Sequence, residues 1–483
     1  MLSKSGNDGR NQVIFMCLEE AVPQDHILRK IDAVIDFEFV YDLVKGLYSE
    51  EIGRPSIDPV ILIKIMMIQH FFGIRSMRQT IREIELNMAY RWFLGMSMMD
   101  SVPHYSTISK NYERRFAGTG IFDDIFQEVL NQCAKQGMIR SEVIFMDSTH
   151  LKASANRNKK AKVEVEREAA AYLEELRQEV NQDRINHGKA PFDDPPASEP
   201  ETVTLTKSTT DPDSGLFVKG EHDRCFAYGI QTACDRNGLV LGYEVVPGNT
   251  SDMASFYSVY NEVKGFEPLA IAMDAGYISG HIARQLIKDQ IVPLLPYKRP
   301  LGKGGPYGKA AFVYDEYFDC YICPENQILR YGTTDRRGVR HYRSSREVCE
   351  RCPVRAACFS SRAKNRIITR HIWEPYLEQA EDIRHTLDIR ELYKERKQTI
   401  ERVFADGKEK HRLRYTNYRG RTRVRDSVAL TFACMNLLKL SRWLVRNGRL
   451  PFSRFIDLLF CHLYMLRDSL HHHIMPKYLP IPL

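Results

Sequence analysis

Three carboxylates stand at positions from which they could act together. Asp147 follows the apolar run "VIFM" (143–146), Asp274 follows "AIAM" (270–273), and small or polar residues come next in both cases. Glu401 lies in "RKQTIERVFADGKEKH" (396–411), a basic segment that we expect to be helical. An aspartate after a strand is commonly a turn residue, so each acid alone indicates little.

Taken together, the three acids suit metal-dependent phosphoryl transfer. Cutting or joining a nucleic-acid backbone uses two divalent cations roughly 4 Å apart, one activating the nucleophile and one stabilising the leaving oxygen. Mg²⁺ prefers oxygen ligands and keeps several waters, so two or three carboxylates from separate elements suffice. Without cations, such acids raise one another's pKa. The residues therefore predict a site for two Mg²⁺ or Mn²⁺ ions on Asp147, Asp274 and Glu401.

A second group of residues suits zinc. Five of the 11 cysteines lie within 39 positions, in "CYIC" and "CERCPVRAAC". They are Cys320, Cys323, Cys349, Cys352 and Cys358. Two Cys-x2-Cys elements can close a tetrahedral structural Zn²⁺ site, but five candidates compete for four places. Such a site could fold a loop that otherwise lacks a core, as a module that contacts DNA. The six other cysteines stand singly in apolar contexts, which is typical of packing residues.

The third feature is an excess of positive charge in the C-terminal third. Residues 361–450 carry 22 Lys/Arg and 11 Asp/Glu, although the whole chain has a net charge of only +7. The run "KEKHRLRYTNYRGRTRVR" (408–425) holds eight Lys/Arg and two tyrosines directly after Glu401. It is either a solvated face or a surface for phosphates and exposed bases. The neighbouring acid favours the second interpretation.

The elements that must position these residues differ along the chain. Residues 20–140 have helical periodicity, with Asp58 as an expected N-cap and Pro59 as the first helical residue. Short helices separated near Gly73 and over 95–103 are typical of either a helix-turn-helix domain that binds DNA or a plain helical bundle.

From residue 142 the period changes to that of strands. We expect strands at 142–147, 225–234, 239–248, 268–276 and 291–297, with Asp147 at the end of the first. A hairpin turn at 236–238 and helices at 252–264 and 279–289 complete a mixed α/β sheet. Two insertions interrupt it: 155–222, with a charged helix expected over 159–184, and 300–370, with the clustered cysteines.

These motifs resemble those of bacterial insertion-sequence transposases of the DDE type. "MDSTHLKASANRNK" looks like the first-aspartate motif and "AMDAGY" looks like the second. "YKERKQTIERVFADGK" is similar to the third motif, Tyr-x2-Arg-x3-Glu-x6-Lys. The "GRPS" entry to the N-terminal helices also resembles the leading domain of this group. The resemblance covers about residues 20–440.

The resemblance implies roles for individual residues. Asp147, Asp274 and Glu401 take the catalytic, metal-binding positions. Four residues rather than three separate Arg396 from Glu401, so either Arg396 or Lys397 has the arginine role. The implied DNA contacts, extended along the basic run, are Tyr393, Arg396, Lys397, Lys408, Lys410, Arg412 and Arg414. Related cysteine-rich insertions favour Cys323, Cys349, Cys352 and Cys358 as the Zn²⁺ ligands, with Cys320 as the alternative.

The fold that the resemblance implies is an α/β catalytic core with an RNase H-like mixed sheet flanked by helices, an all-α N-terminal domain and a small zinc-binding insertion. The expected parts are a helical DNA-binding domain at 1–140, catalytic residues at 141–299 and 371–450, the zinc-binding insertion at 300–370 and a tail at 451–483. The implied activity is cleavage and joining of DNA strands at the ends of a mobile element.

The expected partners are the terminal inverted repeats of the element, its target DNA and a second copy of the chain in the synaptic complex. The N-terminus lacks the apolar core of a secretion signal, so we expect a cytoplasmic protein without a membrane span. Two rival hypotheses remain at this point. One is a stand-alone nuclease of the same fold, and the other is a zinc-containing DNA-binding regulator without catalysis.

Overall fold

The computed structural model contains all 483 residues and describes 12–49, 56–166, 172–193, 202–219, 223–297, 307–359 and 363–448. The expected tail at 451–483 lies outside the described residues. The chain divides into two compact units. The helical unit comprises 1–139, 406–413 and 422–483, and the sheet unit comprises 140–405 and 414–421. Each unit is described separately below.

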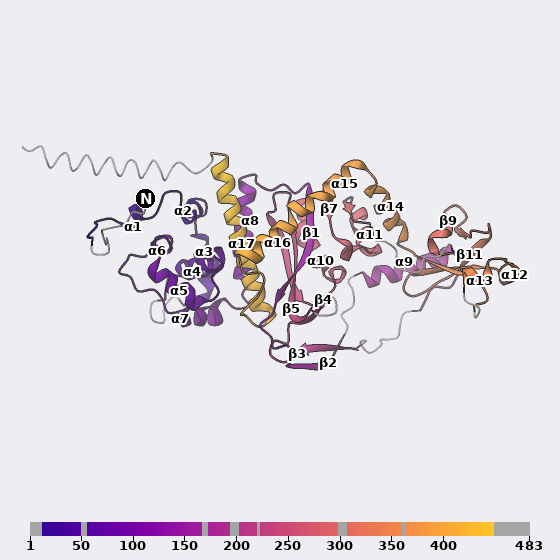
Figure 1. Ribbon diagram of the computed structural model, residues 1–483, viewed down its shortest axis with the longest axis horizontal. Coiled ribbons are helices and arrows are strands. Elements are labelled where there is room, and N and C mark those ends of the chain that lie inside the picture. Colours follow the sequence, from indigo (N-terminus) through magenta and orange to yellow (C-terminus); the bar gives the residue numbers. More distant parts are fainter. Residues whose placement is uncertain are drawn as a thin grey trace, which may run out of the picture. The chain divides into compact units, whose positions relative to one another are not determined.

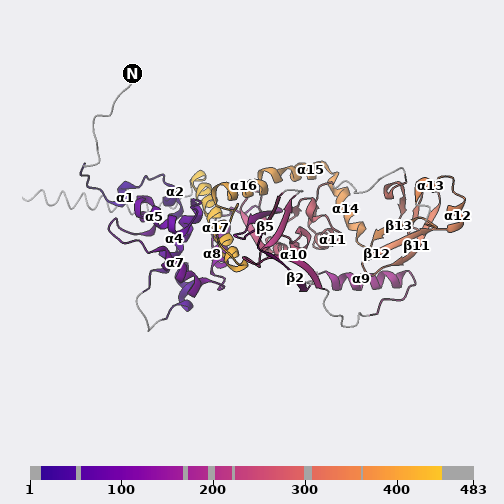
Figure 2. The same cartoon turned by 60° about the horizontal axis from the view of Figure 1, so that its bottom comes forward.

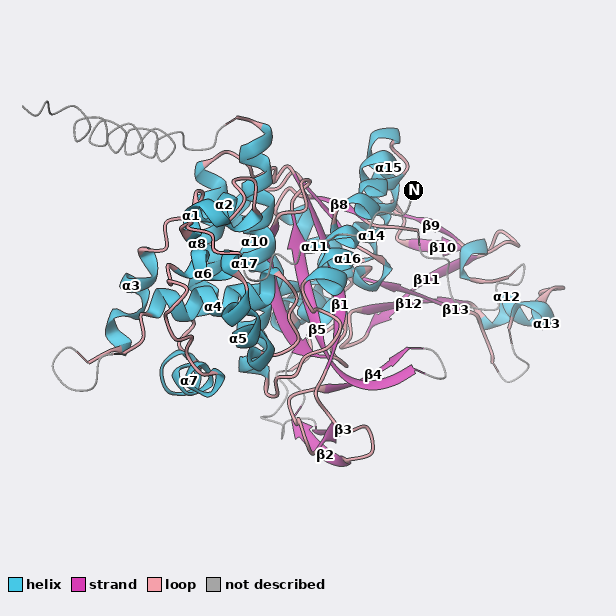
Figure 3. Ribbon diagram, turned by 60° about the vertical axis from the view of Figure 1, so that its left-hand side comes forward, coloured by secondary structure: helices cyan, strands magenta, loops and turns pink. Residues whose placement is uncertain are grey.

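The helical unit is built from short helices and one long one (Figure 3). They are α1 (Leu18–Ala21), α2 (Ile27–Asp32), α3 (Phe39–Val44), α4 (Pro59–Phe71), α5 (Met77–Leu86), α6 (Met88–Leu94), α7 (Tyr105–Asn111), α8 (Ile121–Lys135) and α17 (Arg421–Arg446). The Asp58 side chain accepts the Val60 N–H at 2.7 Å with Pro59 at the first position, which confirms the expected start of α4.

Helix α17 is long and apolar enough to cross a membrane when judged by length and composition alone. However, 72% of its apolar window is buried inside the protein, as in the core helix of a globular unit. A buried hydrogen bond at 2.9 Å joins its Thr431 Oγ1 to Nδ1 of His70 on α4. Burial holds the pKa of His70 near 3, so the imidazole is neutral at physiological pH. The helix is therefore a packing element of the helical unit.

The sheet unit is a mixed α/β structure around an eight-stranded sheet (Figure 1). Its centre has the order β6 (Val240–Pro247), β5 (Asp223–Cys234), β1 (Val143–Lys152), β7 (Ala270–Ala272) and β8 (Val292–Leu294). The first three strands are antiparallel, whereas β7 and β8 run parallel to β1. The strands β4 (Gly215–Lys219), β3 (Thr202–Ser208) and β2 (Lys160–Glu166) extend the sheet from β5.

Helices connect and follow these strands. They are α10 (Asp252–Val263), α11 (Gly280–Lys288), α14 (Glu374–Arg384), α15 (Leu387–Lys394) and α16 (Ile400–Lys410). The hairpin between β5 and β6 turns at the expected place, where Asp235 Oδ1 accepts the N–H groups of Asn237 and Leu239 and Gly238 has a φ of 71°. Thus the central strands, their hairpin and the helices between them agree with the sequence pattern.

Two sequence expectations, one about the end of β1 and one about a helix in the charged insertion, are wrong. β1 does not end at Asp147 but continues to Lys152, because β5 stays paired with it over the whole stretch. The expected helix at 159–184 also begins differently, since 160–166 is strand β2 and only Leu173–Asn186 forms helix α9. The run "KVEVE" alternates with period two, and pairing with the equally alternating β3 decides for a strand despite the helix-forming charged residues.

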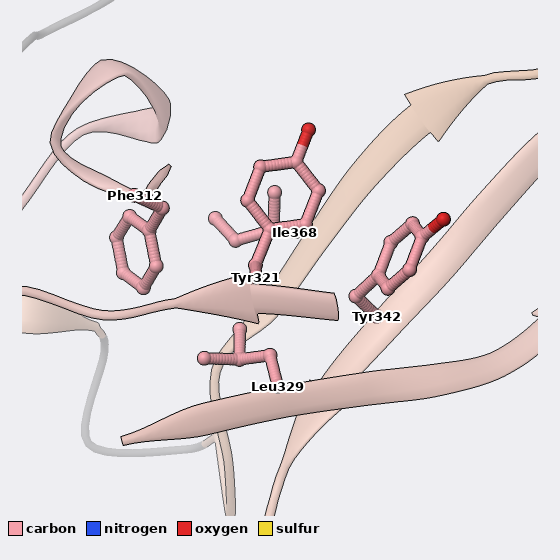
Figure 4. Close-up of a cluster of buried hydrophobic side chains, with 5 residues drawn as sticks. All are labelled: Phe312, Tyr321, Leu329, Tyr342 and Ile368. Carbon is pink, nitrogen blue, oxygen red and sulfur yellow. The ribbon is translucent and has the colours of Figure 1, made fainter. Parts of the chain in front are cut away.

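The cysteine-rich insertion is a second, antiparallel sheet with the order β13-β12-β11-β10-β9. The strands are β9 (Val313–Asp315), β10 (Cys320–Ile322), β11 (Ile328–Thr334), β12 (Val339–Ser344) and β13 (Ile367–His371), with α12 (Arg346–Glu350) and α13 (Arg355–Cys358) between the last two. One face carries an apolar cluster of Phe312, Tyr321, Leu329, Tyr342 and Ile368 (Figure 4). The expectation of a loop without a core is therefore wrong.

The two insertions fold together, which no sequence pattern predicted. Helix α9 lies along the five-stranded sheet (Figures 1 and 2). Its buried Asp183 accepts hydrogen bonds from Arg340 Nε at 2.9 Å and Thr334 Oγ1 at 2.6 Å. On the next residue, Arg184 Nη1 donates to the Thr334 carbonyl at 2.7 Å. A charged helix can dock here because the sheet supplies partners for its buried charge.

We expect Asp183→Ala to destabilise the sheet unit by about 3–5 kcal/mol, because it leaves the Arg340 guanidinium without its buried partner. Glu174→Ala on the same helix is the matched control, since Glu174 is exposed and its partners Arg177 and Gln178 belong to the same helix. Urea unfolding followed by circular dichroism measures both changes. Equal free energies of unfolding for the two variants would contradict the docking described here.

Candidate active site

Asp147 and Asp274 are brought together by the pairing of β1 with β7. The register is parallel, with Phe145 opposite Ala272. Asp147 and Asp274 therefore each lie two residues beyond the last pair between β1 and β7, at the same edge of the sheet. Asp147 remains in β1, opposite Thr232 of β5, whereas the chain leaves the sheet before Asp274. Asp147 thus lies near the end of β7, whereas β1 itself continues to Lys152.

The Asp147 carboxylate is largely buried, with a side-chain exposure of 17%. Oδ1 accepts the Ser148 N–H at 2.8 Å, and Oδ2 accepts from Arg396 Nη2 at 2.7 Å. Burial is the largest influence and raises the pKa of Asp147 to about 6, although Arg396 and the Ser148 N–H lower it. The charges of Asp274 and Asp252 raise this pKa further. A protein without bound cations thus disfavours ionised Asp147.

Asp274 also has the turn-capping role that is common for an aspartate after a strand. Its side chain caps the short 3₁₀ turn Ala275–Tyr277, and Oδ1 accepts the Gly276 N–H at 2.7 Å. The other carboxylate oxygen takes no part in this cap. Capping therefore fixes the Asp274 carboxylate in place, and its charge still acts on Asp147.

A third acid at this site, Asp252, was missed by the sequence analysis. A Cβ at Gly276 would lie 2.5 Å from Asp252 Oδ2 and 2.9 Å from Asp274 Oδ1, so only glycine fits between these carboxylates. Asp252 Oδ1 accepts from Gln231 Nε2 at 3.0 Å, and Gln231 in turn accepts from the buried Tyr277 hydroxyl. In the sequence, "NTSD" before a helix indicates only a cap, and Ser251 is indeed the N-cap of α10.

The structure distinguishes the two cations that the third motif left open. Arg396 is buried with 7% exposure, binds Asp147 and donates to the Tyr393 hydroxyl at 3.1 Å, whereas Lys397 is exposed. The helix is interrupted at Thr399, whose φ and ψ are −109° and −95°, between a 3₁₀ turn and α16. This break accommodates the additional residue between Arg396 and Glu401.

Glu401 is not brought to the aspartates. It is exposed in the first turn of α16. Within the described ranges, no group of three or more His, Cys, Asp or Glu side chains is arranged to hold a metal ion. Oxygen donors of the kind that suit a hard cation nevertheless lie near one another, since Asp274 and Asp252 both approach Gly276 and the charges of both raise the pKa of Asp147. Thr232 Oγ1, on the strand position opposite Asp147, is buried without a partner and is a further oxygen at this site.

The remaining candidates for DNA contact lie in two different units. Lys408, Lys410 and Arg412 belong to the helical unit, where Lys410 pairs with Asp406 at 2.6 Å and Arg412 Nη2 donates to the Arg75 carbonyl at 2.8 Å. Arg414 belongs to the sheet unit and is exposed. Its carbonyl accepts the Lys152 N–H at 3.1 Å, so the basic run continues the edge of β1.

Four of the five clustered thiols gather around one cavity. Cys323, Cys349, Cys352 and Cys358 line it. Burial, together with the three other thiols, raises the pKa of Cys358, while Arg366 lowers it. Cys320 does not line the cavity, since it alternates with the core residue Tyr321 along β10. Among the other cysteines, Cys17 is exposed, which corrects its expected role in packing.

Comparisons with known proteins identify the class. A model described as a transposase domain (DUF772) matches residues 16–114, and a model described as a transposase DDE domain matches residues 322–441. The chain is therefore a DDE-type transposase, an enzyme class that acts on DNA and generally uses divalent metal ions. Its function is DNA transposition.

Two solved structures are weakly similar to the chain. The first is a piggyBac transposase synaptic complex with hairpin DNA, with 10% identity, coverage of 94% of this chain and 86% of the other, and a TM-score of 0.37. The second is a Mos1 transposase paired-end complex with the left transposon end, with 9% identity, coverage of 51% and 61%, and a TM-score of 0.15. A search of curated proteins gives no match.

The burial of Asp147 predicts a pH-dependent stability. In the folded, cation-free protein burial raises the pKa of Asp147 to about 6, above the usual value for an aspartate, so ionisation of this group destabilises the fold. Its unfavourable contribution is absent below about pH 4 and grows as the pH rises through about 6, to at most about 3 kcal/mol.

We therefore expect Asp147→Asn, which cannot ionise, to lose this part of the pH dependence. Urea unfolding in chelated buffer at about pH 4 and about pH 7 measures it. Asp193→Asn, at an exposed position, serves as the control. An identical pH dependence in wild type and Asp147→Asn would show that the Asp147 pKa is not raised.

Proposed function

We propose that Asp147, Asp274 and Glu401 hold two Mg²⁺ or Mn²⁺ ions and that this site cleaves and joins DNA strands at the ends of the element. The observation that carries the proposal is the parallel pairing of β1 with β7, which places the first two carboxylates side by side in a buried position. When bound, the ions would activate the attacking hydroxyl and stabilise the leaving oxygen.

The order of the central strands supports an RNase H-like core. In β6-β5-β1-β7-β8, three antiparallel strands are followed by two strands parallel to β1. In this proposal, residues 141–299 and 371–450 form the catalytic domain, 300–370 form the zinc-binding insertion, and the helices of 1–140 bind DNA. The outlying strands β2, β3 and β4 belong to the charged insertion at 155–222.

Several residues position the acidic side chains of this site or compensate their negative charge. Arg396 neutralises Asp147 while cations are absent, and its guanidinium keeps further donors for a phosphate oxygen. Gln231 holds Asp252, and Gly276 leaves room for both neighbouring carboxylates. A further carboxylate would add to the repulsion among the acidic side chains of the site. Glu401 therefore joins the site only when cations and DNA are present. The irregular backbone at Thr399 is the place where α16 can turn toward the site.

The attack on the phosphodiester uses a hydroxyl, first of water and then of a DNA 3′ end, without a covalent link to the protein. Positioning and charge stabilisation supply most of the rate. Tyr393, Arg396 and Lys397 hold the backbone near the cleaved phosphate. The basic residues after Glu401 hold it farther along, through Lys408, Lys410, Arg412 and Arg414.

The wider setting follows from this chemistry. The DNA partners are the terminal inverted repeats and the target site, and joining two ends requires a homodimer in the synaptic complex. We assign the protein to the cytoplasm. The alternatives remain a stand-alone nuclease of the same fold and a DNA-binding regulator, and the cleavage and joining assays described below separate them.

The cavity in the cysteine-rich insertion is proposed to hold a structural Zn²⁺ on Cys323, Cys349, Cys352 and Cys358. The support is that the four thiols line one cavity and influence one another electrostatically. Four thiolates at one site repel one another, so their joint deprotonation is favourable when a metal ion is bound. The insertion has its own apolar cluster, so the ion would fix α12 and α13 to a sheet that is already packed.

The catalytic proposal is tested by Asp147→Ala and Asp274→Ala. We expect each to reduce strand cleavage by about 10³-fold or more, because each removes a carboxylate that would hold the cations, and those cations would stabilise the charge developing at the phosphate. DNA affinity should be unchanged or higher, since an anion is lost. Cleavage and joining are measured on labelled duplexes carrying the inverted repeats that flank the reading frame, with Asp193→Ala as an exposed control.

Each result of this test distinguishes a hypothesis. Cleavage without joining by the wild type would favour the nuclease. A wild type that binds but never cuts these ends would favour the regulator. Normal cleavage by Asp147→Ala would contradict the assignment of the metal ligands.

The zinc proposal is tested by serine substitutions. We expect Cys349→Ser, Cys352→Ser, Cys323→Ser and Cys358→Ser each to lower zinc content from one ion per chain to nearly none. Cys320→Ser is the matched control and should keep its zinc, because Cys320 lies outside the cavity. Mass spectrometry of the metals in protein purified under reducing conditions measures this. Zinc loss in Cys320→Ser, or wild type without zinc, would be the contrary finding.

A further inference from the structure

The five-stranded sheet has one covered face and one open face. Leu329 and Tyr342 point to the covered side, where the apolar cluster lies beside α9 and the cysteine cavity (Figure 4). Side chains alternate along a strand, so their neighbours Arg330 and Arg343 point to the other side. On that side Ile367, directly opposite Arg343, is 43% exposed, and Ile328 is 52% exposed. We refer to this side as the arginine face.

Arg330 and Arg343 are directly opposite each other in the antiparallel pair of β11 and β12. Both side chains are exposed. In the part of the chain that the structure describes, neither makes a hydrogen bond or an ion pair with a protein group. Like charges directly opposite each other on adjacent strands destabilise a sheet. The sheet therefore carries an exposed like-charged pair, while the acidic Asp315 on the same face lies two strands away, beyond Cys320.

Other arginines of the same sheet are neutralised, which sets this pair apart. Arg340 pairs with Asp183 and Arg370 pairs with Glu378, both on the covered side. On α12, Arg346 pairs with Glu350 at 2.6 Å. Two adjacent, unneutralised guanidinium groups on an open face suit an anion with repeated charges, because each group can donate to a phosphate oxygen in a fixed geometry.

We propose that the arginine face binds the DNA backbone, with Arg330 and Arg343 on neighbouring phosphates and the flanking aliphatic side chains against the sugars. DNA is favoured over a second copy of this chain by charge. In a two-fold symmetric contact the same patch meets itself, so the arginine pairs would face each other. A phosphate backbone instead removes the repulsion within the pair and releases counterions.

The inference rests on DNA as the substrate of a transposase, but not on the catalytic residues proposed above. Binding can therefore be measured without divalent ions, so that no strand is cut. If Asp147 and Asp274 prove not to be catalytic, this measurement is unaffected. If the arginine face does not bind DNA, the cleavage assay is likewise unaffected.

The test is the salt dependence of binding of the full-length protein to a mixed-sequence DNA duplex. Each phosphate contact contributes about 0.9 to the slope of log affinity against log salt. We expect the double variant Arg330→Ala, Arg343→Ala to reduce this slope by about 1.8, so that its affinity deficit shrinks about tenfold between about 50 and 200 mM salt. The double lysine variant at these positions should keep the wild-type slope.

Lys309→Ala combined with Arg346→Ala is the matched control, since it removes two cations that already pair with Glu374 and Glu350. Its slope should equal that of the wild type. The alanine variants of the arginine face should also melt no lower than wild type, because they remove a repulsive pair.

Three results would overturn the proposal. The first is an unchanged slope in the double alanine variant, or an equal fall in the control. The second is a change in self-association without a change in slope, which would assign the face to a second copy. The third is unfolding of either single alanine variant, which would show that the arginines hold the sheet together.

Discussion

The site depends on one constraint, the burial of the Asp147 carboxylate next to Asp274, which follows from a short parallel strand pair. Asp147 and Asp274 each lie two residues beyond the paired residues Phe145 and Ala272. Among the residues that the structure describes, Arg396 is the one whose side chain donates a neutralising hydrogen bond to Asp147. The remaining unfavourable charge is visible in the raised pKa of Asp147. In the proposed function a bound cation would relieve this unfavourable charge.

The parts of the site that the sequence predicted are those with local signals. Asp147 and Asp274 follow apolar runs, whereas the pairing of β1 with β7 has no local signal, because more than a hundred residues separate the two strands. The hairpin at 236–238 and the Asp58 cap also have short-range signatures. No short-range signal indicates the length of β1, because the polar residues after Asp147 stay in the strand through pairing with β5, which is far away in the sequence.

Features that depend on long-range contacts were not predictable in this way. Asp252 reaches the site through Gln231, a partner 21 positions away on another element. The docking of α9 on the five-stranded sheet depends on Asp183 meeting Arg340, 157 positions apart. In "KVEVE", helix-forming residue types opposed a strand-forming period, and the β3 partner decided between them. A single sequence carries no record of such pairings, although it contained every residue involved.

Asp147 and Asp274 lie side by side, whereas Glu401 lies apart from them. Its central claim is that cations bind between Asp147 and Asp274 and that Glu401 completes the site. The most direct test is anomalous diffraction from crystals of the protein with Mn²⁺ and a duplex of the element's end. The account predicts Mn²⁺ peaks bridged by the Asp147 and Asp274 carboxylates, with Glu401 as a further ligand. Crystals with Mn²⁺ bound elsewhere and none between these two aspartates would contradict it.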